Sequence, residues 1–232
     1  MLKDREIELM QPWSPMLMRT RMLDSEVQAF LEITDKIINN VNSESWGHKL
    51  AGQIKTELKI EHQDLMQETI EGISAFDVIL EYVKEYISKA VFQYATSQRW
   101  PYFSKQTWKT VLNSCWIVSQ QPGEYNPMHV HTECNISGVF YLKVPEFEKS
   151  IKSTDDDGCI VFLGGSTAGT ETHLVNNRVT WKPRVGDLFV FPSHLAHAVY
   201  PYTCNTGDPE RRSVSFNADF MTESVFKRKF GK

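Results

Sequence analysis

The hydrophobic pattern of the chain changes its period near Trp100 and Pro101. Before this point, apolar residues recur at helical spacing in residues 24–40 and 63–94, with Gly72 as a point where the second helix can break. After it, Gly, Pro and turn residues separate short runs rich in β-branched and aromatic residues, which is typical of strands. The predicted strands cover residues 114–119, 136–143, 159–163, 179–182, 187–191, 196–201 and 212–220. This order predicts a mainly β fold with N-terminal helices, namely a β-sandwich or jelly roll backed by α-helices on one face.

The length of the chain fits one compact domain. Its 232 residues are enough to bury a sizeable apolar interior, and 41% of them are hydrophobic and 23% charged, as in ordinary globular proteins. The sequence has no internal repeat and no low-complexity linker. We therefore expect a single domain over residues 1–232, in which residues 1–105 form a mostly helical support and residues 106–232 form the β core that carries the site.

Charge, hydropathy and cysteine spacing narrow the expected partners and the expected compartment. With 25 basic and 29 acidic side chains, the chain has no overall positive field that would hold nucleic acid, so we do not expect a nucleic-acid partner. No uncharged apolar run approaches twenty residues, which argues against a membrane span and an export signal. The four cysteines are widely spaced and form no CxxC pair, which favours free thiols in a reducing cytoplasm. The sequence leaves open whether the chain forms an oligomer.

Three histidines form the strongest candidate for a metal site. His129 and His131 are two residues apart, and on a strand this spacing directs both imidazoles to the same face. His197 follows a predicted strand and turn, so an antiparallel return can bring it to the same place, whereas His194 falls in the turn. Neutral imidazoles suit Fe, Zn, Cu or Ni, and three ligands on one face leave coordination positions open. The competing interpretation is that these histidines only satisfy buried hydrogen bonds.

The last predicted strand has one polar and one apolar face. Arg211, Ser213, Ser215 and Asn217 alternate with Val214, Phe216, Ala218 and Phe220. If the apolar face packs on the helices, the polar face lines the interior of the barrel, where Arg211 would be a buried cation in need of a carboxylate. A dicarboxylate that chelates the metal at one end could pair with Arg211 at the other, with help from the Ser213 hydroxyl. The alternative makes Arg211 and Arg212 a solvated surface pair.

These motifs together resemble a branch of the Fe(II)/2-oxoglutarate-dependent oxygenase superfamily that is frequent in marine bacteria and their phages. The resemblance rests on His129-x-His131, the segment 137–142, Phe191-Pro192-Ser193 with His197, and Arg211-x-Ser213, and it spans roughly residues 116–219. It implies a double-stranded β-helix of the jelly-roll or cupin-like type, with Fe(II) on the histidines and 2-oxoglutarate held by Arg211 and Ser213. The implied activity is a dioxygenase reaction that consumes O2, releases succinate and CO2, and hydroxylates a peptide or protein, of prolyl type, or a small metabolite.

The chain departs from the superfamily in one ligand. The usual motif is His-x-Asp or His-x-Glu with a distal His, whereas His129-x-His131 places an imidazole where the carboxylate stands. A register shifted by two residues, His131-x-Glu133, would restore the carboxylate. His129 would then support a ligand through a hydrogen bond without touching the metal. We prefer His129, His131 and His197 because the branch that the chain resembles shows paired histidines here.

Two other functions remain as hypotheses. A three-histidine cupin-like enzyme would bind metal without using 2-oxoglutarate. A non-enzymatic jelly-roll binding protein would bind no metal at all, and metal analysis of the purified chain would separate it from both enzymes.

Overall fold

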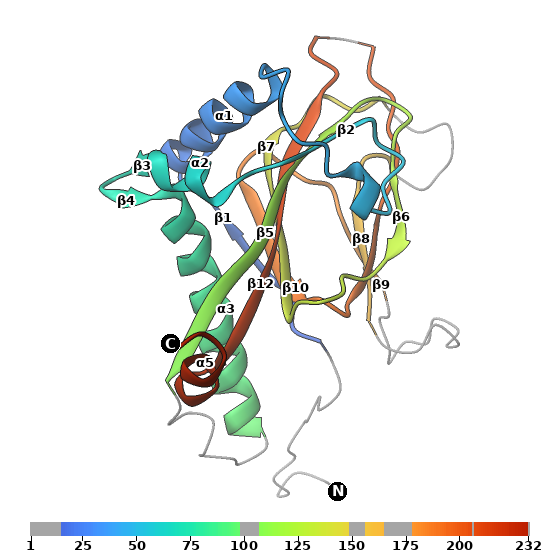
Figure 1. The fold of residues 1–232 in the computed structure, drawn as a ribbon. Helices are drawn as coiled ribbons and strands as arrows, with labels where there is room; N and C mark the ends of the chain where they lie inside the picture. The colour runs from blue at the N-terminus through green and yellow to red at the C-terminus, as the bar shows by residue number, and fades with distance from the viewer. Residues whose placement is uncertain (1–14, 98–106, 149–155, 165–177, 206, 232) are drawn as a thin grey trace, which may run out of the picture.

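A computed structural model describes residues 15–97, 107–148, 156–164, 178–205 and 207–231. Figure 1 shows helices on one side of a large sheet and a second sheet on its other side. The helices are α1 (Asp24–Ile38), η1 (Gly47–Lys49, a 3-10 helix), α2 (His62–Gln67), α3 (Ala75–Ser97) and α5 (Glu223–Phe230). No helix in the described part of the chain is long and apolar enough to cross a membrane.

All strands pair antiparallel and form two sheets that face each other and a small hairpin. The six-stranded sheet has the order β1 (Met18–Arg21), β10 (Asp187–Pro192), β7 (Ile136–Lys143), β12 (Arg211–Thr222), β5 (Trp108–Gln120) and β2 (Thr56–Lys59). The four-stranded sheet has the order β6 (Asn126–His129), β11 (Ala196–Val199), β8 (Ile160–Leu163) and β9 (Arg178–Trp181). The hairpin pairs β3 (Thr69–Ile70) with β4 (Ile73–Ser74). The expected mainly β jelly roll backed by helices is confirmed.

The core lies on both faces of the six-stranded sheet. Between this sheet and the helices, Phe30 of α1 contacts Phe140 of β7, with ring centroids 4.7 Å apart, and Phe216 of β12 is fully buried. Between the two sheets, Phe162 of β8 packs against Phe191 of β10, with ring centroids 5.1 Å apart. The helical layer therefore holds one face of β12, and the other face points toward the four-stranded sheet.

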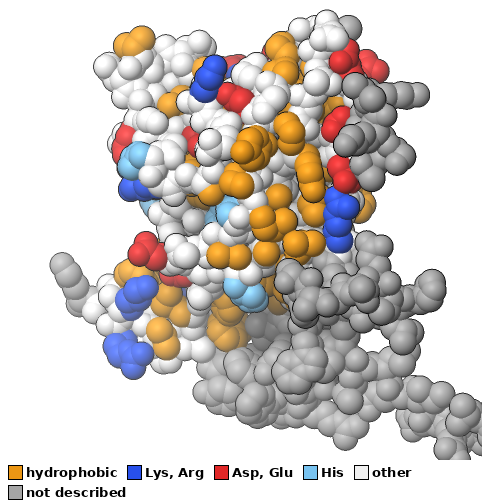
Figure 2. Space-filling model, turned by 90° about the vertical axis from the view of Figure 1, so that its right-hand side faces the viewer, with side chains coloured by type: hydrophobic (Ala, Val, Ile, Leu, Met, Phe, Trp, Pro, Cys, Tyr) orange, Lys and Arg blue, Asp and Glu red, His pale blue; other side chains and the backbone are white. Residues whose placement is uncertain are grey.

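The outer face of the four-stranded sheet carries hydrophobic side chains at its surface (Figure 2). Met128 of β6 is 48% exposed, whereas the next residue, His129, is only partly exposed. Because successive side chains of a strand point to opposite faces, His129 points inward, into the space between the sheets.

The N-terminal part differs in detail from the sequence expectation. The second predicted helix breaks at Gly72, the expected point, but the break contains the β3–β4 hairpin, whose turn includes Gly72 with a φ of +93°. Strands β1 and β2, which also come from this part, add the two edges of the large sheet. The short strand β6, with Pro127 inside it, was not predicted as a strand of its own.

Candidate metal centre

His129, His131 and His197 lie together between the two sheets. His129 of β6 and His197 of β11 are paired in register, and their ring centroids are 4.2 Å apart. His131 lies just beyond the end of β6, where its backbone N–H donates to the Ser193 carbonyl at 2.9 Å. Its ring centroid is 5.3 Å from that of His129 and 5.1 Å from that of His197. One ligand atom from each histidine lies within 4.8 Å of the other two, which is a spacing that a single ion can bridge.

The hydrogen bonds of the three rings fix which nitrogen is left for a ligand. Nδ1 of His129 donates to the Pro127 carbonyl at 2.7 Å, and Nδ1 of His197 donates to the Leu195 carbonyl at 2.9 Å. A carbonyl can only accept, so both rings carry their proton on Nδ1. Nδ1 of His131 lies 2.7 Å from Oδ1 of Asn217 on β12. This arrangement leaves Nε2 of each ring unprotonated, as a metal ligand requires.

The three imidazoles are also held neutral. Burial lowers the pKa of His131 to about 4, and burial together with the other two imidazoles lowers the pKa of His197 to about 3. Burial likewise lowers the pKa of His129. A neutral imidazole is the form that binds a metal, so the site needs no deprotonation at neutral pH.

The other sequence candidates for this centre lie elsewhere. Glu133 is exposed, has a φ of +61° and is outside the group of mutually close ligand atoms, although it lines the same pocket. His194 is exposed in the turn between β10 and β11, as expected.

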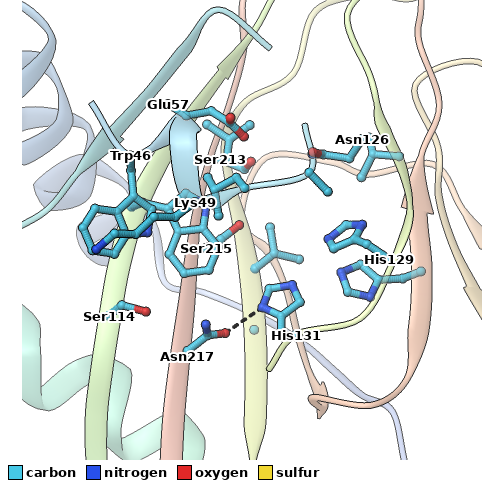
Figure 3. A pocket seen from close by; sticks show the side chains of 18 of the residues that line it. Trp46, Lys49, Glu57, Ser114, Asn126, His129, His131, Ser213, Ser215 and Asn217 are labelled. Atoms are coloured by element: carbon cyan, nitrogen blue, oxygen red, sulfur yellow. Dashed lines mark hydrogen bonds between the residues drawn. The ribbon is translucent and has the colours of Figure 1, made fainter. Parts of the chain in front are cut away.

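The histidines stand at one side of a pocket of about 420 Å³ between the sheets. Its floor includes the polar face of β12, from which Ser213, Ser215 and Asn217 follow one another toward His131 (Figure 3). The apolar residues of that strand, Val214, Phe216 and Ala218, belong to the core under the helices. The predicted division of β12 into a polar inner face and an apolar outer face is confirmed.

Arg211, also in this pocket, is a buried cation. Its side chain is 2% exposed, its Nη1 donates to the Gly158 carbonyl at 2.7 Å, and its Nη2 donates to Oε1 of Gln120. The rings of Tyr141 and Tyr202 each lie 5.8 Å from the guanidinium. Among the described residues, no carboxylate pairs with Arg211 and no acceptor reaches its buried Nε. A buried guanidinium without a counter-charge is costly, so this end of the pocket is suited to an anion.

The neighbouring Arg212 is buried for a different reason. It is 4% exposed and points to the opposite face of β12, where Glu210 accepts from Nε at 2.8 Å and Asp35 of α1 accepts from Nη1 at 2.5 Å. The alternative in which Arg211 and Arg212 form a solvated surface pair is therefore wrong.

Some pocket residues precede the β core and were not predicted from the sequence. Trp46, Lys49 and Glu57, from the segment around η1 and β2, line the wall opposite the histidines (Figure 3). Short polar runs such as Thr56–Lys59 carry no alternation that would place them in a sheet, and no motif marks Glu57.

Comparison with known proteins gives a family match to part of the chain and several similar solved structures. Residues 114–217 match the model of a family described as "Putative 2OG-Fe(II) oxygenase". No curated protein matches the chain. A prolyl hydroxylase from Trichoplax adhaerens, solved with a peptide fragment of the hypoxia inducible factor oxygen degradation domain, is 12% identical over 93% of this chain and 87% of its own, with a TM-score of 0.52.

Two other solved structures are similar at lower TM-scores. A prolyl-4-hydroxylase from Pseudomonas putida is 16% identical over 87% of this chain and 91% of its own, with a TM-score of 0.45. The viral collagen prolyl hydroxylase of Paramecium Bursaria Chlorella virus-1, solved with 2-oxoglutarate, is 12% identical over 87% and 94%, with a TM-score of 0.47.

The Trichoplax structure supports the fold, and the family match covers the part of the chain that builds the pocket. The matched segment runs from β5 to β12 and contains all three histidines together with Arg211 and Ser213. Through this segment, which is just under half of the chain, the protein is similar to the 2OG-Fe(II) oxygenase family, whose members use Fe(II), 2-oxoglutarate and O2.

Proposed function

We propose that His129, His131 and His197 hold Fe(II) through their Nε2 atoms and that Arg211 and Ser213 bind the distal carboxylate of 2-oxoglutarate. The observation that carries this proposal is the unpaired, buried guanidinium of Arg211 in the same pocket as the three neutral imidazoles. Ser213 supports it, because its side chain lines the pocket two residues along the same face of β12.

The donor set fits a ferrous ion. Three imidazole nitrogens on one side leave the other coordination positions open for an organic chelator and O2. When bound, Fe(II) and 2-oxoglutarate would supply an oxidation by O2, in which one oxygen atom enters succinate as CO2 is released and the other hydroxylates the substrate C–H bond.

The chain itself positions and shields the reactants. The Nδ1 hydrogen bonds to Pro127, Leu195 and Asn217 fix the orientation of the three rings. Arg211 neutralises one carboxylate, and the rings of Tyr141 and Tyr202 beside it keep water from that ion pair, which strengthens it.

The prime substrate that we propose is a peptide or protein, hydroxylated on a proline-like residue, or a small metabolite. The prolyl-type reaction is suggested by analogy with the Trichoplax prolyl hydroxylase. A fold does not fix a substrate, so direct assay of peptides and of small metabolites decides between these classes.

The experiment is succinate formation by the purified full-length chain, with Fe(II) and 2-oxoglutarate each left out in turn, followed by mass spectrometry of offered proline-containing peptides for a gain of one oxygen. We expect succinate only when both are present, and its loss in Arg211→Ala. Turnover that continues without any 2-oxo acid supports a three-histidine cupin-like enzyme instead. A chain that retains no metal after reconstitution supports a non-enzymatic protein.

A further inference from the structure

Glu57 is a buried carboxylate that faces the pocket from the edge of the large sheet. It lies on β2 opposite Val118 of β5, which in turn lies opposite Ser213 of β12. Residues directly opposite each other on neighbouring strands point to the same face, so Glu57 and Ser213 share the inner face of the sheet. Two strand spacings separate them, which is about 10 Å. Both line the pocket (Figure 3), and Glu57 is 2% exposed.

This carboxylate has no partner in the described part of the chain. Oε2 is buried without a hydrogen bond, and no described cation lies within ion-pairing distance of either oxygen. Lys49 and Lys59 interact with other groups. Nζ of Lys49 lies 3.9 Å from the centroid of the Trp46 ring, and Nζ of Lys59 lies 2.5 Å from Oε1 of Glu61. Buried polar groups in folded proteins almost always have partners, so this exception requires a reason.

The raised pKa of the Glu57 carboxyl is consistent with a site that binds a cation. Burial, and then the charge of Glu124, raise its pKa to about 7. The Glu124 carboxylate is itself satisfied, since it accepts from the backbone N–H groups of Lys55 and Gln121. A cation placed against Glu57 would remove the penalty for its ionised form.

The backbone beside Glu57 leaves room for its side chain. A Cβ on Gly52 would lie 2.7 Å from Oε1 of Glu57 and 2.5 Å from Oδ1 of Asn126. Asn126 also lines the pocket, so the glycine keeps two polar side chains in place at this wall. Any side chain at position 52 would force both of them to move.

The charges that line the pocket point to the chemistry of the missing partner. Four charged side chains besides the histidines line the pocket, namely Lys49, Glu57, Glu133 and Arg211. Glu133 is exposed, the ammonium of Lys49 lies over the Trp46 ring, and Arg211 is matched by the distal carboxylate of 2-oxoglutarate under the proposed function. Glu57 then remains as the buried carboxylate of this pocket that has no partner among the described residues.

We propose that Glu57 binds a cationic nitrogen group of the prime substrate, an ammonium or a guanidinium. This inference rests on the proposed function and adds the class of substrate: a compound or peptide with a basic amine or guanidine near the carbon that is oxidised. Trp46 and Trp116 line the same pocket, and their rings suit the apolar part of such a group.

The test is saturation-transfer NMR on the full-length protein with n-butylammonium chloride as the probe and 1-butanol as its neutral counterpart, at constant ionic strength. We expect n-butylammonium to bind the wild type, and Glu57→Gln to weaken that binding at least tenfold. The matched control is Glu44→Gln, which removes the same charge from an exposed residue paired with Lys59 and should leave the affinity unchanged. Binding of 1-butanol should be the same in all three proteins.

Two further variants keep the test independent of the glutamine substitution. Glu57→Asp retains the charge but withdraws it by one methylene, and Gly52→Ala retains the residue but displaces its carboxylate, so both should weaken n-butylammonium binding. Equal affinity of n-butylammonium for the wild type and Glu57→Gln, or no binding to the wild type, overturns the proposal. The measurement needs neither metal nor 2-oxoglutarate, so its failure and the failure of the proposed function are distinguishable.

Discussion

Nδ1 of His131 lies 2.7 Å from Oδ1 of Asn217, a residue 86 positions later in the chain. Asn217 also accepts from the Ser137 hydroxyl at 2.9 Å, so its amide is fixed on the floor of the pocket. His131 lies beyond the end of β6, and the bond to β12 therefore gives its ring the support that the strand gives to His129. The orientation of one proposed iron ligand thus depends on the large sheet and not on its own strand.

Replacement of Asn217 by Ala should weaken metal binding. The change removes the acceptor for Nδ1 of His131, and loss of such an outer partner typically costs about 10–100-fold in metal affinity. Competition between the protein and a chelator for Mn(II) or Fe(II) measures this affinity. Ser215→Ala is the matched control, because Ser215 lies on the same face of β12 and bonds to none of the three histidines. Equal loss of affinity in both variants would contradict the assigned support.

Stability should fall in acid through Glu210. Burial raises the pKa of this carboxyl, but hydrogen bonds from Arg212, Ser119 and Lys143 outweigh burial and lower it to about 2. A depressed folded-state pKa gives stability that is present above the unfolded value of 4.5 and is lost as the pH falls toward 2. We expect Glu210 to contribute on the order of 1–2 kcal/mol, after allowance for its partial contact with solvent. Urea unfolding of the wild type and Glu210→Gln across this range should show the difference between the two proteins shrink as the pH falls.

Glu57 should make the folded protein less stable as the pH rises, which is the opposite of the effect of Glu210. Its folded-state pKa of about 7 lies above the unfolded value of 4.5, so the folded state binds the extra proton and loses stability as the pH rises from 4.5 to 7. Glu57→Gln removes the buried charge and should raise the free energy of unfolding at pH 8 by on the order of 1–2 kcal/mol. Urea unfolding at pH 5 and pH 8 measures it. A variant that is less stable than the wild type at pH 8 would show that Glu57 has an internal partner.

Gly138 should be intolerant of any side chain. It lies on β7 opposite Phe216, and a Cβ at this position would collide with the Phe216 ring. Both residues sit in a closely packed sheet, where overpacking typically costs about 1–3 kcal/mol, and we expect a loss of this size in Gly138→Ala. Thermal unfolding tests it, with Gly164→Ala as the control, because the nearest atom of a described residue to a Cβ at Gly164 is 3.9 Å away.

The sequence predicted the central strands of the β core better than the strands at the edges of the large sheet. The alternation in residues 211–220 placed Arg211 and Ser213 inside the barrel correctly, because a two-residue period has only one arrangement that buries the apolar side. The strands β1 and β2 could not be placed, since a four-residue strand at a sheet edge is selected by pairing with distant residues and not by its own pattern. Glu57 was missed for the same reason, because its burial comes from β5 and from the segment around Gly52.

The spacing of His129 and His131 predicted a shared target for both rings, but not the way it is achieved. His131 lies outside β6, so strand alternation alone does not direct it. Its position depends on the backbone bond to Ser193 and the side-chain bond to Asn217, both of which are long-range contacts.

The most direct test of the account is anaerobic titration of the Fe(II)-loaded protein with 2-oxoglutarate, followed by the weak visible charge-transfer band of a 2-oxo acid that chelates ferrous iron. We predict that the wild type forms the band, that His129→Ala loses it with the metal, and that Arg211→Ala retains the metal but needs far more 2-oxoglutarate to form it. Iron binding without a band in the wild type, or a band whose midpoint is unchanged in Arg211→Ala, would contradict the proposed site.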